Sequence, residues 1–409
     1  MSKWEEKRLE DIIDVNPPVK LKKGESYPFI DIDKVSPTRR SVTNEDVKIY
    51  DGQSSSKFCD GDTVFSRITP CLENRKIAKV AIEGDAAFGS TEFYVFRAKK
   101  KKADARFTYY LTSSDAVVLP AINSMTGASG RQRADKRFIQ RLKLNLPDLP
   151  TQERIADILS TYDDLIESNN RRIELLEQTA QELYKEWFVR FRFPGYENAK
   201  FENGLPEGWS YVRFGKAIDI IDGDRGVNYP KQEELYPEGD CLFLNAGNVT
   251  TKGFDFSSCA YITKEKDTIL RKGKLQHGDV VLTTRGTVGN VAFYNETMTF
   301  SEMRINSGMV ILRNLGVVSP EYIYTALRHE YLQKLMTLYA SGSAQPQLPI
   351  KDMKRMKIIK ADAKTMERFT EMSADIYSQI SLLIMKNQTL AKQRDMLLPR
   401  LMSGKLEVN

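Results

Sequence analysis

The segment "IADILSTYDDLIESNNRRIELLEQTAQELYKEW" (Ile155–Trp187) decides the fold of this chain. Steps of four and three residues from its start give ten positions, all apolar except Asn169. The ten positions are Ile155, Leu159, Tyr162, Ile166, Asn169, Ile173, Leu176, Ala180, Leu183 and Trp187. An apolar residue every 3.5 positions is the seam of a coiled coil. A helix of about forty residues is a rod roughly 60 Å long.

A second seam lies 214 residues further on, and seven of its ten positions are apolar. These positions are Phe369, Ser373, Ile376, Ile380, Leu383, Asn387, Leu390, Arg394, Leu397 and Leu401. Because a lone helix cannot bury its apolar stripe, we expect the two helices to pair antiparallel within one molecule. A homodimeric coiled coil is the alternative. Asn169 either fixes the register of the seam or faces solvent.

The whole chain repeats at about half its length, starting at Trp4 and at Trp209. The matching segments include Tyr27–Val35 with Cys241–Val249, Cys59–Pro70 with Leu275–Thr287, Gly89–Arg97 with Ile305–Arg313, and Gly127–Leu144 with Ala340–Ile358. Short alternating runs between Gly-Asp turns predict strands. Shorter helices are expected around Phe107–Leu119 and Pro320–Leu338.

The repeat predicts an α+β fold: two homologous strand-rich domains separated by two long antiparallel helices that form an intramolecular coiled coil with pseudo-twofold symmetry. The expected boundaries are 1–150 for the first domain, 151–195 for the central helix, 196–363 for the second domain and 364–409 for the distal helix.

The formal charge of +6 is unevenly distributed. Residues 1–150 hold 27 Lys+Arg and 21 Asp+Glu, whereas the remainder holds 34 of each. Six basic residues surround Asp135 and form either a phosphate-neutralising cluster or a solvated surface. These are Arg131, Arg133, Lys136, Arg137, Arg141 and Lys143.

Other classes of protein receive little support from the sequence. No apolar run approaches the length of a membrane span, and the charged N-terminus lacks the centre of a signal peptide, so a cytoplasmic location is expected. Four cysteines without a Cys-x-x-Cys pair and two histidines favour idle thiols over a zinc site.

Asn16-Pro17-Pro18 resembles the catalytic loop of DNA adenine methyltransferases, but Val19 stands where an aromatic ring would stack on the flipped base. The second copy has no such motif. No Gly-rich loop follows a strand to bind S-adenosylmethionine, and "RGTVGN" (Arg285–Asn290) is expected between strands. We therefore expect a Pro-fixed turn here, and no catalytic residues, nuclease site or P-loop in this chain.

The duplication, the helix entry "LPDLPTQERIADIL", the restart "GLPEGW" (Gly204–Trp209) and the ending "RLMSGKLEV" (Arg400–Val408) together resemble the specificity subunit of a Type I restriction–modification enzyme. The resemblance covers nearly the whole chain. It implies a non-catalytic, anti-phage DNA-recognition protein, in which each domain reads half of a bipartite, asymmetric site. The helices would then set the gap between the half-sites.

The resemblance also implies partners. These are double-stranded DNA, two methyltransferase subunits that carry S-adenosylmethionine, and two motor-nuclease subunits that use ATP and Mg. No cofactor or metal is expected in this chain, and no membrane partner. The rival hypotheses are a coiled-coil adaptor whose globular ends bind proteins, and an autonomous methyltransferase.

Base readout in the major groove favours Arg or Lys on guanine and Asn or Gln on adenine. Candidates should lie in loops that the two copies share but fill differently. In the first copy they are Arg67, Asn74, Arg75, Lys76, Arg131, Gln132 and Arg133; in the second they are Arg285, Thr287, Asn290, Ser343, Gln345 and Gln347. The alternative for each is a phosphate contact or none. Arg67 and Arg285, which the repeat matches with each other, are alternatively structural arginines paired with a carboxylate.

Overall fold

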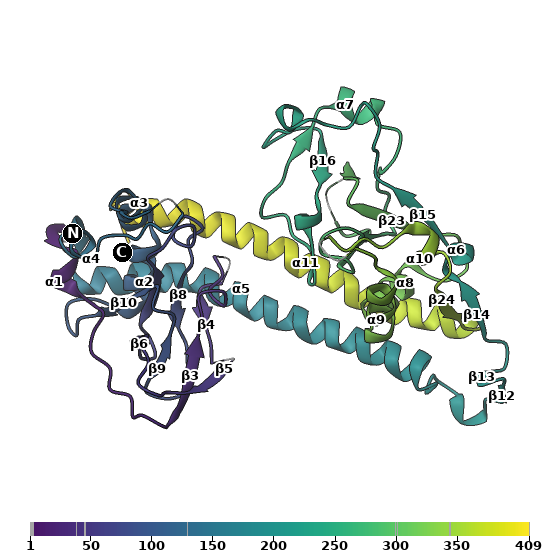
Figure 1. Cartoon of the computed structure of the whole chain (residues 1–409), viewed down its shortest axis with the longest axis horizontal. Helices are drawn as coiled ribbons and strands as arrows, with labels where there is room; N and C mark the ends of the chain where they lie inside the picture. Colours follow the sequence, from purple (N-terminus) through teal and green to yellow (C-terminus); the bar gives the residue numbers. More distant parts are fainter. Residues whose placement is uncertain are drawn as a thin grey trace. The chain divides into compact units, whose positions relative to one another are not determined.

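The computed structural model describes residues 4–37, 39–44, 46–128, 130–298, 300, 302–342 and 345–408. The chain divides into two compact units (Figure 1). Unit 1 comprises Met1–Ser168 and Asn387–Asn409, and unit 2 comprises Asn169–Lys386. Each unit therefore contains one end of each long helix.

The two long helices begin with the same cap. Helix α5 spans Leu149–Tyr184 and continues into the π-helical turn Lys185–Val189, and α11 spans Ala363–Met402. The N–H of Thr151 donates to the Asp148 carboxylate at 3.1 Å, and the N–H of Thr365 donates to Asp362 at 3.0 Å. An acid that accepts a backbone N–H at a helix start stabilises the first turn.

The start of each long helix packs against the end of the other. In unit 1, Ile155 of α5 and Leu401 of α11 belong to one buried cluster. In unit 2, the ring of Phe369 near the start of α11 lies 5.9 Å from that of Trp187, just beyond α5. The predicted antiparallel pairing within one chain is confirmed. Asn169 is buried, so the alternative that it faces solvent is wrong.

Unit 1 contains two sheets and a two-stranded ribbon. The five-stranded sheet has the order β2 (Ile13–Val15), β10 (Phe93–Ala98), β7 (Thr63–Ser66), β8 (Ile77–Val80) and β4 (Ser41–Val42). The four-stranded sheet has the order β5 (Asp46–Ile49), β3 (Ser26–Ile30), β9 (Ala87–Gly89) and β6 (Ser56–Phe58). The ribbon pairs β1 (Trp4–Arg8) with β11 (Lys143–Pro147). The short helices are α1 (Leu9–Ile12), α2 (Ala105–Ser113), α3 (Asp115–Asn123) and α4 (Lys136–Gln140).

Unit 2 repeats this plan. Its main sheet has the order β15 (Ile218–Asp222), β23 (Met309–Asn314), β20 (Asp279–Thr283) and β21 (Val291–Tyr294). Its second sheet has the order β19 (Tyr261–Ile262), β16 (Cys241–Leu244) and β22 (Met303–Ile305). Two-stranded pairs join β14 (Ser210–Arg213) to β24 (Lys357–Lys360), β17 (Val249–Thr250) to β18 (Gly253–Phe254), and β12 (Phe201–Glu202) to β13 (Leu205–Pro206). The helices are α6 (Phe214–Ala217), α7 (Lys264–Ile269), α8 (Pro320–Arg328), α9 (Glu330–Tyr339) and α10 (Ile350–Met353).

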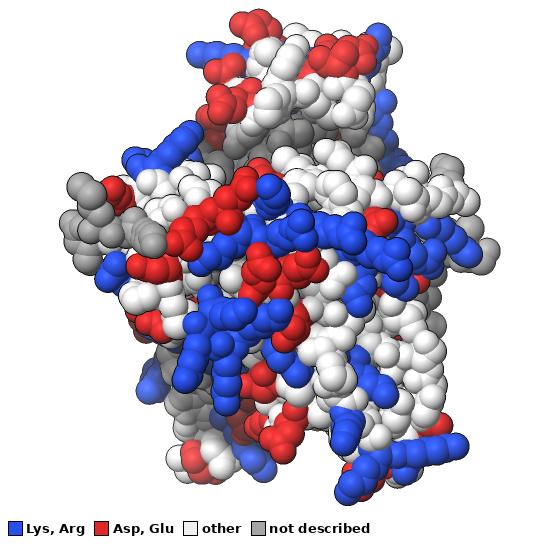
Figure 2. Space-filling model, turned by 90° about the vertical axis from the view of Figure 1, so that its left-hand side faces the viewer, with Lys and Arg blue, Asp and Glu red and all other residues white. Residues whose placement is uncertain are grey.

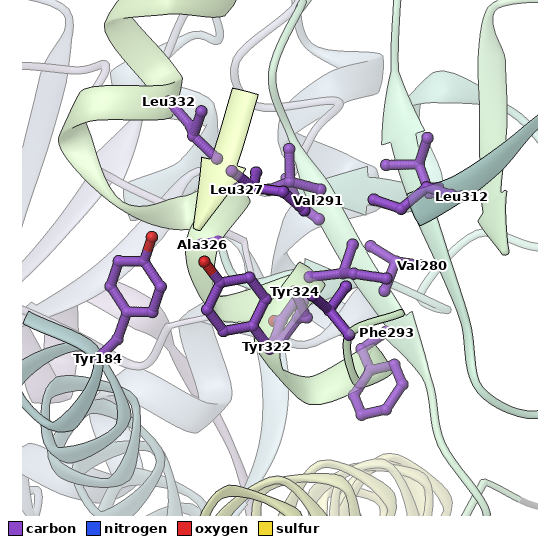
Figure 3. Close-up of a cluster of buried hydrophobic side chains, with 14 of the residues drawn as sticks. Tyr184, Val280, Val291, Phe293, Leu312, Tyr322, Tyr324, Ala326, Leu327 and Leu332 are labelled. Atoms are coloured by element: carbon purple, nitrogen blue, oxygen red, sulfur yellow. The ribbon is translucent and has the colours of Figure 1, made fainter. Parts of the chain in front are cut away.

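Each main sheet is buried on both faces. On β7, Phe65 joins the cluster that includes α2 and α5, while Val64 points into the cluster shared with the second sheet. Leu282 and Val281 divide in the same way in unit 2. Figure 3 shows Tyr184 reaching from α5 toward α8 and the strand residues beyond it. Alternate residues of a strand point to opposite faces, so both cores follow from one apolar run.

Two of the predicted helices are each broken in the middle. Around 107–119 the structure has α2 and α3, with Ser114 between them, and around 320–338 it has α8 and α9, with His329 between them. Both linking residues adopt extended dihedrals, which ends one helix and caps the next. Among the described residues, no helix is long and apolar enough to span a bilayer.

Candidate nucleic-acid interface

A buried carboxylate–arginine pair holds the main sheet together in each unit. Asp62 accepts two hydrogen bonds from Arg97, at 2.7 and 2.6 Å. Asp279 accepts two from Arg313, at 2.9 and 2.7 Å. Both carboxylates also accept a backbone N–H at 2.7 Å. The repeated Gly-Asp turn and the distant Arg of each copy therefore form one anchor, which fixes the start of β7 and of β20.

In unit 1 two loops meet where β7 ends. The first, the strand-exit loop, covers residues 67–76. The second, the bridge-closed loop, covers 126–133 and is closed by paired backbone bonds between Thr126 and Arg133. Arg67 joins the two loops, since its carbonyl accepts the N–H of Ala134 at 2.8 Å. Gly127, with a φ of 127°, makes the tight entry to the bridge-closed loop.

Unit 2 has the same pair of loops at the end of β20. Its strand-exit loop covers 284–290, and its bridge-closed loop covers 341–347, closed by backbone bonds between Ser341 and Gln347. The Thr284 carbonyl accepts the N–H of Leu348 at 2.9 Å. Gly342, with a φ of 101°, has the position of Gly127. The predicted candidates thus lie in two equivalent loop pairs.

The apparent match between Arg67 and Arg285 is wrong by one residue. The backbone N–H of Arg67 donates to the backbone carbonyl of Glu92 at 2.9 Å. The backbone N–H of Thr284 donates to the backbone carbonyl of Gly308, also at 2.9 Å. Isolated bridges join Ile68 to Arg133 and Arg285 to Gln347. Arg67 is therefore equivalent to Thr284, and Arg285 to Ile68. The two arginines do not share a structural role.

Arg67 and Arg133 both hold one acid. Arg133 contacts the Glu92 carboxylate at 2.9 and 2.6 Å, and Arg67 contacts it at 3.2 Å. The hydrogen bond from Arg133 is the largest cause that lowers the pKa of Glu92. The Arg67 guanidinium also lies over the ring of Tyr94. Both arginines are therefore paired with a carboxylate, which is the alternative given above for Arg67 and was not expected for Arg133.

The end of the strand-exit loop in unit 1 is tied to neighbouring elements. Arg75 forms an ion pair with Asp115 at the start of α3 and donates to the Ser113 carbonyl at 3.2 Å. Lys76 donates to the Ile32 carbonyl at 2.9 Å. Asn74 is exposed, and its backbone N–H closes the turn onto Pro70.

Arg131 is an exposed basic candidate near the tip of the bridge-closed loop. Gln132 pairs with Thr69 through its backbone, at 3.0 and 3.1 Å, so the loop is fixed while its tip points to solvent. A side chain on a fixed backbone can approach a ligand with little loss of entropy.

The unit 2 candidates divide into fixed and free groups. Asn290 donates to the Val249 carbonyl at 2.9 Å and is a structural residue of the turn. Thr287, Gln345 and Gln347 are exposed. The Nε of Arg285 is buried and lacks a hydrogen-bond partner among the described residues. Ser343 lies outside the described residues.

A basic ridge recurs beside each bridge-closed loop. The first ridge is formed by exposed Arg8, Arg137, Arg141 and Lys143, and the second by exposed Arg213, Lys351, Arg355 and Lys357. Arg8 lies directly across from Lys143 in one ribbon, and Arg213 across from Lys357 in the other. Like charges opposed across strands destabilise a sheet. Figure 2, which views the molecule from the end that carries α1, α3 and α4 in Figure 1, shows a belt of Lys and Arg across this face.

Several relevant residues were missed because the sequence search favoured charged and amide side chains within the loops. Glu92, in the turn just before β10, fixes two of the candidates. Gln333 of α9 donates to the Gly289 carbonyl at 2.8 Å and supports the turn before Asn290. Leu338 and Tyr339 are exposed at the end of α9, directly before a bridge-closed loop. An apolar residue beside a polar loop was a usable signal, because such residues contact thymine methyl groups.

The Asn-Pro-Pro stretch is part of the sheet edge. The Asn16 side chain accepts the N–H of Val95 at 2.9 Å, and its φ is 57°. The amide is therefore occupied by a backbone bond at the end of β2. Among the described residues, no three His, Cys, Asp or Glu side chains gather to hold a metal ion.

Known proteins share this organisation. The family model of the Type I restriction modification DNA specificity domain matches residues 1–178 and 206–381. The MjaIX specificity subunit of Methanocaldococcus jannaschii is 24% identical, with 99% of this chain and 94% of that protein covered. The HindI specificity subunit of Haemophilus influenzae is 23% identical, with 88% and 90% covered.

A solved structure shows the same fold. The S subunit of a Type I restriction–modification system from M. genitalium superposes with a TM-score of 0.55 at 14% identity, covering 98% of this chain and 96% of that one. The family model is matched twice, once in each half, as the internal duplication requires. This chain therefore belongs to the family of Type I restriction–modification DNA specificity proteins.

Proposed function

We propose that each unit reads one half of a bipartite, asymmetric DNA site through its strand-exit and bridge-closed loops. The family assignment establishes the coarser function, a DNA specificity subunit of a Type I restriction–modification complex. The carrying observation is that both units present the same pair of loops, closed by equivalent backbone bonds but filled with different side chains. Two units with the same loop backbone but different loop side chains are suited to reading two different half-sites.

Exposed side chains on these fixed loops are the favoured base contacts. Arg131 in unit 1 and Gln345 with Gln347 in unit 2 have the chemistry for guanine and adenine edges. Arg67 and Arg133 instead position the loop through Glu92.

The two basic ridges would supply affinity that does not depend on sequence. They occupy equivalent positions in both units, although the loops beside them differ. A feature shared by two domains that read different bases fits the one ligand group they have in common, the phosphate backbone. Each neutralised phosphate releases a counterion and makes binding more sensitive to salt.

The long helices would set the gap between the half-sites and dock two methyltransferase subunits. Two motor-nuclease subunits would complete the restriction enzyme. In this proposal the chain itself is not catalytic: S-adenosylmethionine belongs to the methyltransferase partner, and ATP and Mg to the motor-nuclease. A coiled-coil adaptor with protein-binding ends is not favoured, because the relatives that match over most of this chain are specificity subunits.

The proposal is tested by mapping methylated adenines after reconstitution with the methyltransferase subunits. The expected result is a split motif with an unread gap of fixed length. Arg131→Ala should relax one half of that motif, and Gln347→Ala should relax the other. A continuous motif, or relaxation of the same half by both variants, would contradict the assignment of one half-site to each unit.

The ridges have a separate readout. Arg141→Ala and Arg355→Ala should each weaken binding equally for all sequences and reduce the slope of log K against log salt by about 0.9. Phe138→Ser, in α4 between two ridge residues, is a matched control that removes no charge. A change of motif in a ridge variant would show that the ridge contacts bases.

A further inference from the structure

A buried carboxylate lies in the contact between α5 and α11 in unit 1. Asp163 of α5 is 3% exposed and forms an ion pair with Arg394 of α11. It also accepts a hydrogen bond of 2.5 Å from the hydroxyl of Tyr110 on α2. A buried acid is stable only when a cation or several donors satisfy it.

The equivalent contact in unit 2 has the opposite character. The offset of 214 residues between the helix caps places Tyr377 at the position of Asp163, and Ala180 at that of Arg394. Tyr377 is 3% exposed, and its hydroxyl bonds to Thr325 of α8, the counterpart of Tyr110. Ala180 is fully buried in the same cluster. An acid and a cation in one unit are thus replaced by an aromatic ring and a small residue in the other.

We propose that these contacts restrict the long helices to heterologous pairing, α5 with α11, and exclude pairing of either helix with its own copy in a second chain. Antiparallel α5 with α5 would place Asp163 against Ala180 and leave a buried carboxylate without a cation. Antiparallel pairing of α11 with a second α11 would place Arg394 against Tyr377. The long side chain of Arg394 would then face a bulky ring and would have no carboxylate to pair with.

A polar residue in a coiled-coil seam selects the partner helix at the expense of stability. A half-buried ion pair of α5, Glu177 with Arg328, joins the helix to α8 and not to α11. Arg40 likewise joins its own domain to Asp164 of α5. The contact with Arg328 also favours association of the N-terminal with the C-terminal half of the chain, whereas the pair of Asp163 with Arg394 acts directly between the two long helices.

Heterologous pairing has a functional consequence. If neither long helix pairs with its own copy, each assembly contains one copy of unit 1 and one copy of unit 2. The recognition protein then stays asymmetric, because its two units differ. The inference concerns helix pairing alone and holds whichever bases either unit reads.

The test uses the full chain with a protease site inserted after Asn203, in the exposed turn between β12 and β13. Cleavage after folding yields an N-terminal and a C-terminal fragment that remain associated. After dilution and re-equilibration, native mass spectrometry counts the three possible pairs. We expect wild-type fragments to form N–C pairs, with N–N and C–C pairs absent.

Replacing the ion pair by Asp163→Leu with Arg394→Leu should keep the seam apolar and remove selection by this pair. Homodimeric pairs should then appear beside the N–C pairs, which the remaining contact of Glu177 with Arg328 still favours. The matched control, Glu182→Ala with Lys185→Ala, removes an exposed pair on α5 and should leave the N–C pairing unchanged. Homodimers from the wild type, or exclusive N–C pairs from the double leucine variant, would overturn the proposal.

Charge exchange gives a readout that does not require the leucine variant to fold. Asp163→Arg alone should abolish N–C pairs, because it opposes two cations. Adding Arg394→Asp should restore them. Failure of the second change to restore N–C pairing would equally overturn the proposal.

Discussion

Neutralising the duplicated anchor should destabilise each unit separately and by a similar amount. In Asp62→Asn and in Asp279→Asn the side chain keeps its shape but loses its charge and one of its two acceptor oxygens, so that at most one of the two bonds from Arg97 or Arg313 can remain. Both acids are 2% exposed as side chains. Hydrogen bonds to charged groups contribute about 1.5–3 kcal/mol each, so two bonds set an upper limit of about 6 kcal/mol.

The arginines reduce that limit, because their side chains are 31% and 30% exposed and regain hydration when released. We therefore expect each variant to lower the unfolding free energy of its own unit by about 2–4 kcal/mol, since breaking a buried pair costs about 3–5 kcal/mol when neither partner is solvated. Hydrogen exchange measured by mass spectrometry on the full chain reports each unit separately.

The exposed pair Glu330–Lys334 is the control, and Glu330→Gln should change stability by less than about 1 kcal/mol. The reasoning would be refuted if Asp62→Asn cost no more than this control. It would also be refuted if protection in unit 2 fell as much as in unit 1.

The remaining predictions concern the loops. Arg131→Ala and Gln345→Ala should each lose about 1–3 kcal/mol of discrimination at one base pair, measured by binding to single-substitution DNA duplexes, with unchanged melting curves. Because Arg133 lowers the pKa of Glu92, the contact stabilises the loop above the usual glutamate pKa and is lost as the pH falls through the lowered value. The protection factors of residues 126–133, which are corrected for the intrinsic pH dependence of amide exchange, should therefore fall on acidification in the wild type and should stay constant in Glu92→Gln.

The architecture could be predicted because its signals extend over many residues. Ten seam positions repeated at an offset of 214 residues are hard to produce by chance, and the helix caps Asp148 and Asp362 confirm that offset. The helix breaks at Ser114 and His329 could not be predicted in the same way. One residue with extended dihedrals interrupts each run, and the apolar pattern on either side continues through it.

The candidate site was predicted at the level of loops and not of side chains. The pairing register of a strand decides which face of the sheet each side chain points to, and a shift of one residue moves the side chain to the opposite face. Arg67 and Arg285 therefore appeared equivalent in sequence, whereas the backbone bonds place Arg67 with Thr284. The pairing of Arg67 with Glu92 joins the residue just after β7 to the residue just before β10, so it depends on a contact between distant segments that no local pattern reveals.

The division between shared and divergent features explains how one scaffold can serve two specificities. The anchor of Asp62 or Asp279 and the backbone bridges at the ends of each bridge-closed loop are the same in both units. The side chains of the loops differ, including Arg133 and Gln347 at the bridges themselves, and the described residues between the bridges contribute little to either apolar core. Because exposed residues away from a core change stability by about 0.5 kcal/mol or less, substitutions between the bridges can alter base preference while the fold stays intact. Selection on recognition and selection on folding therefore act on separate residues of this chain.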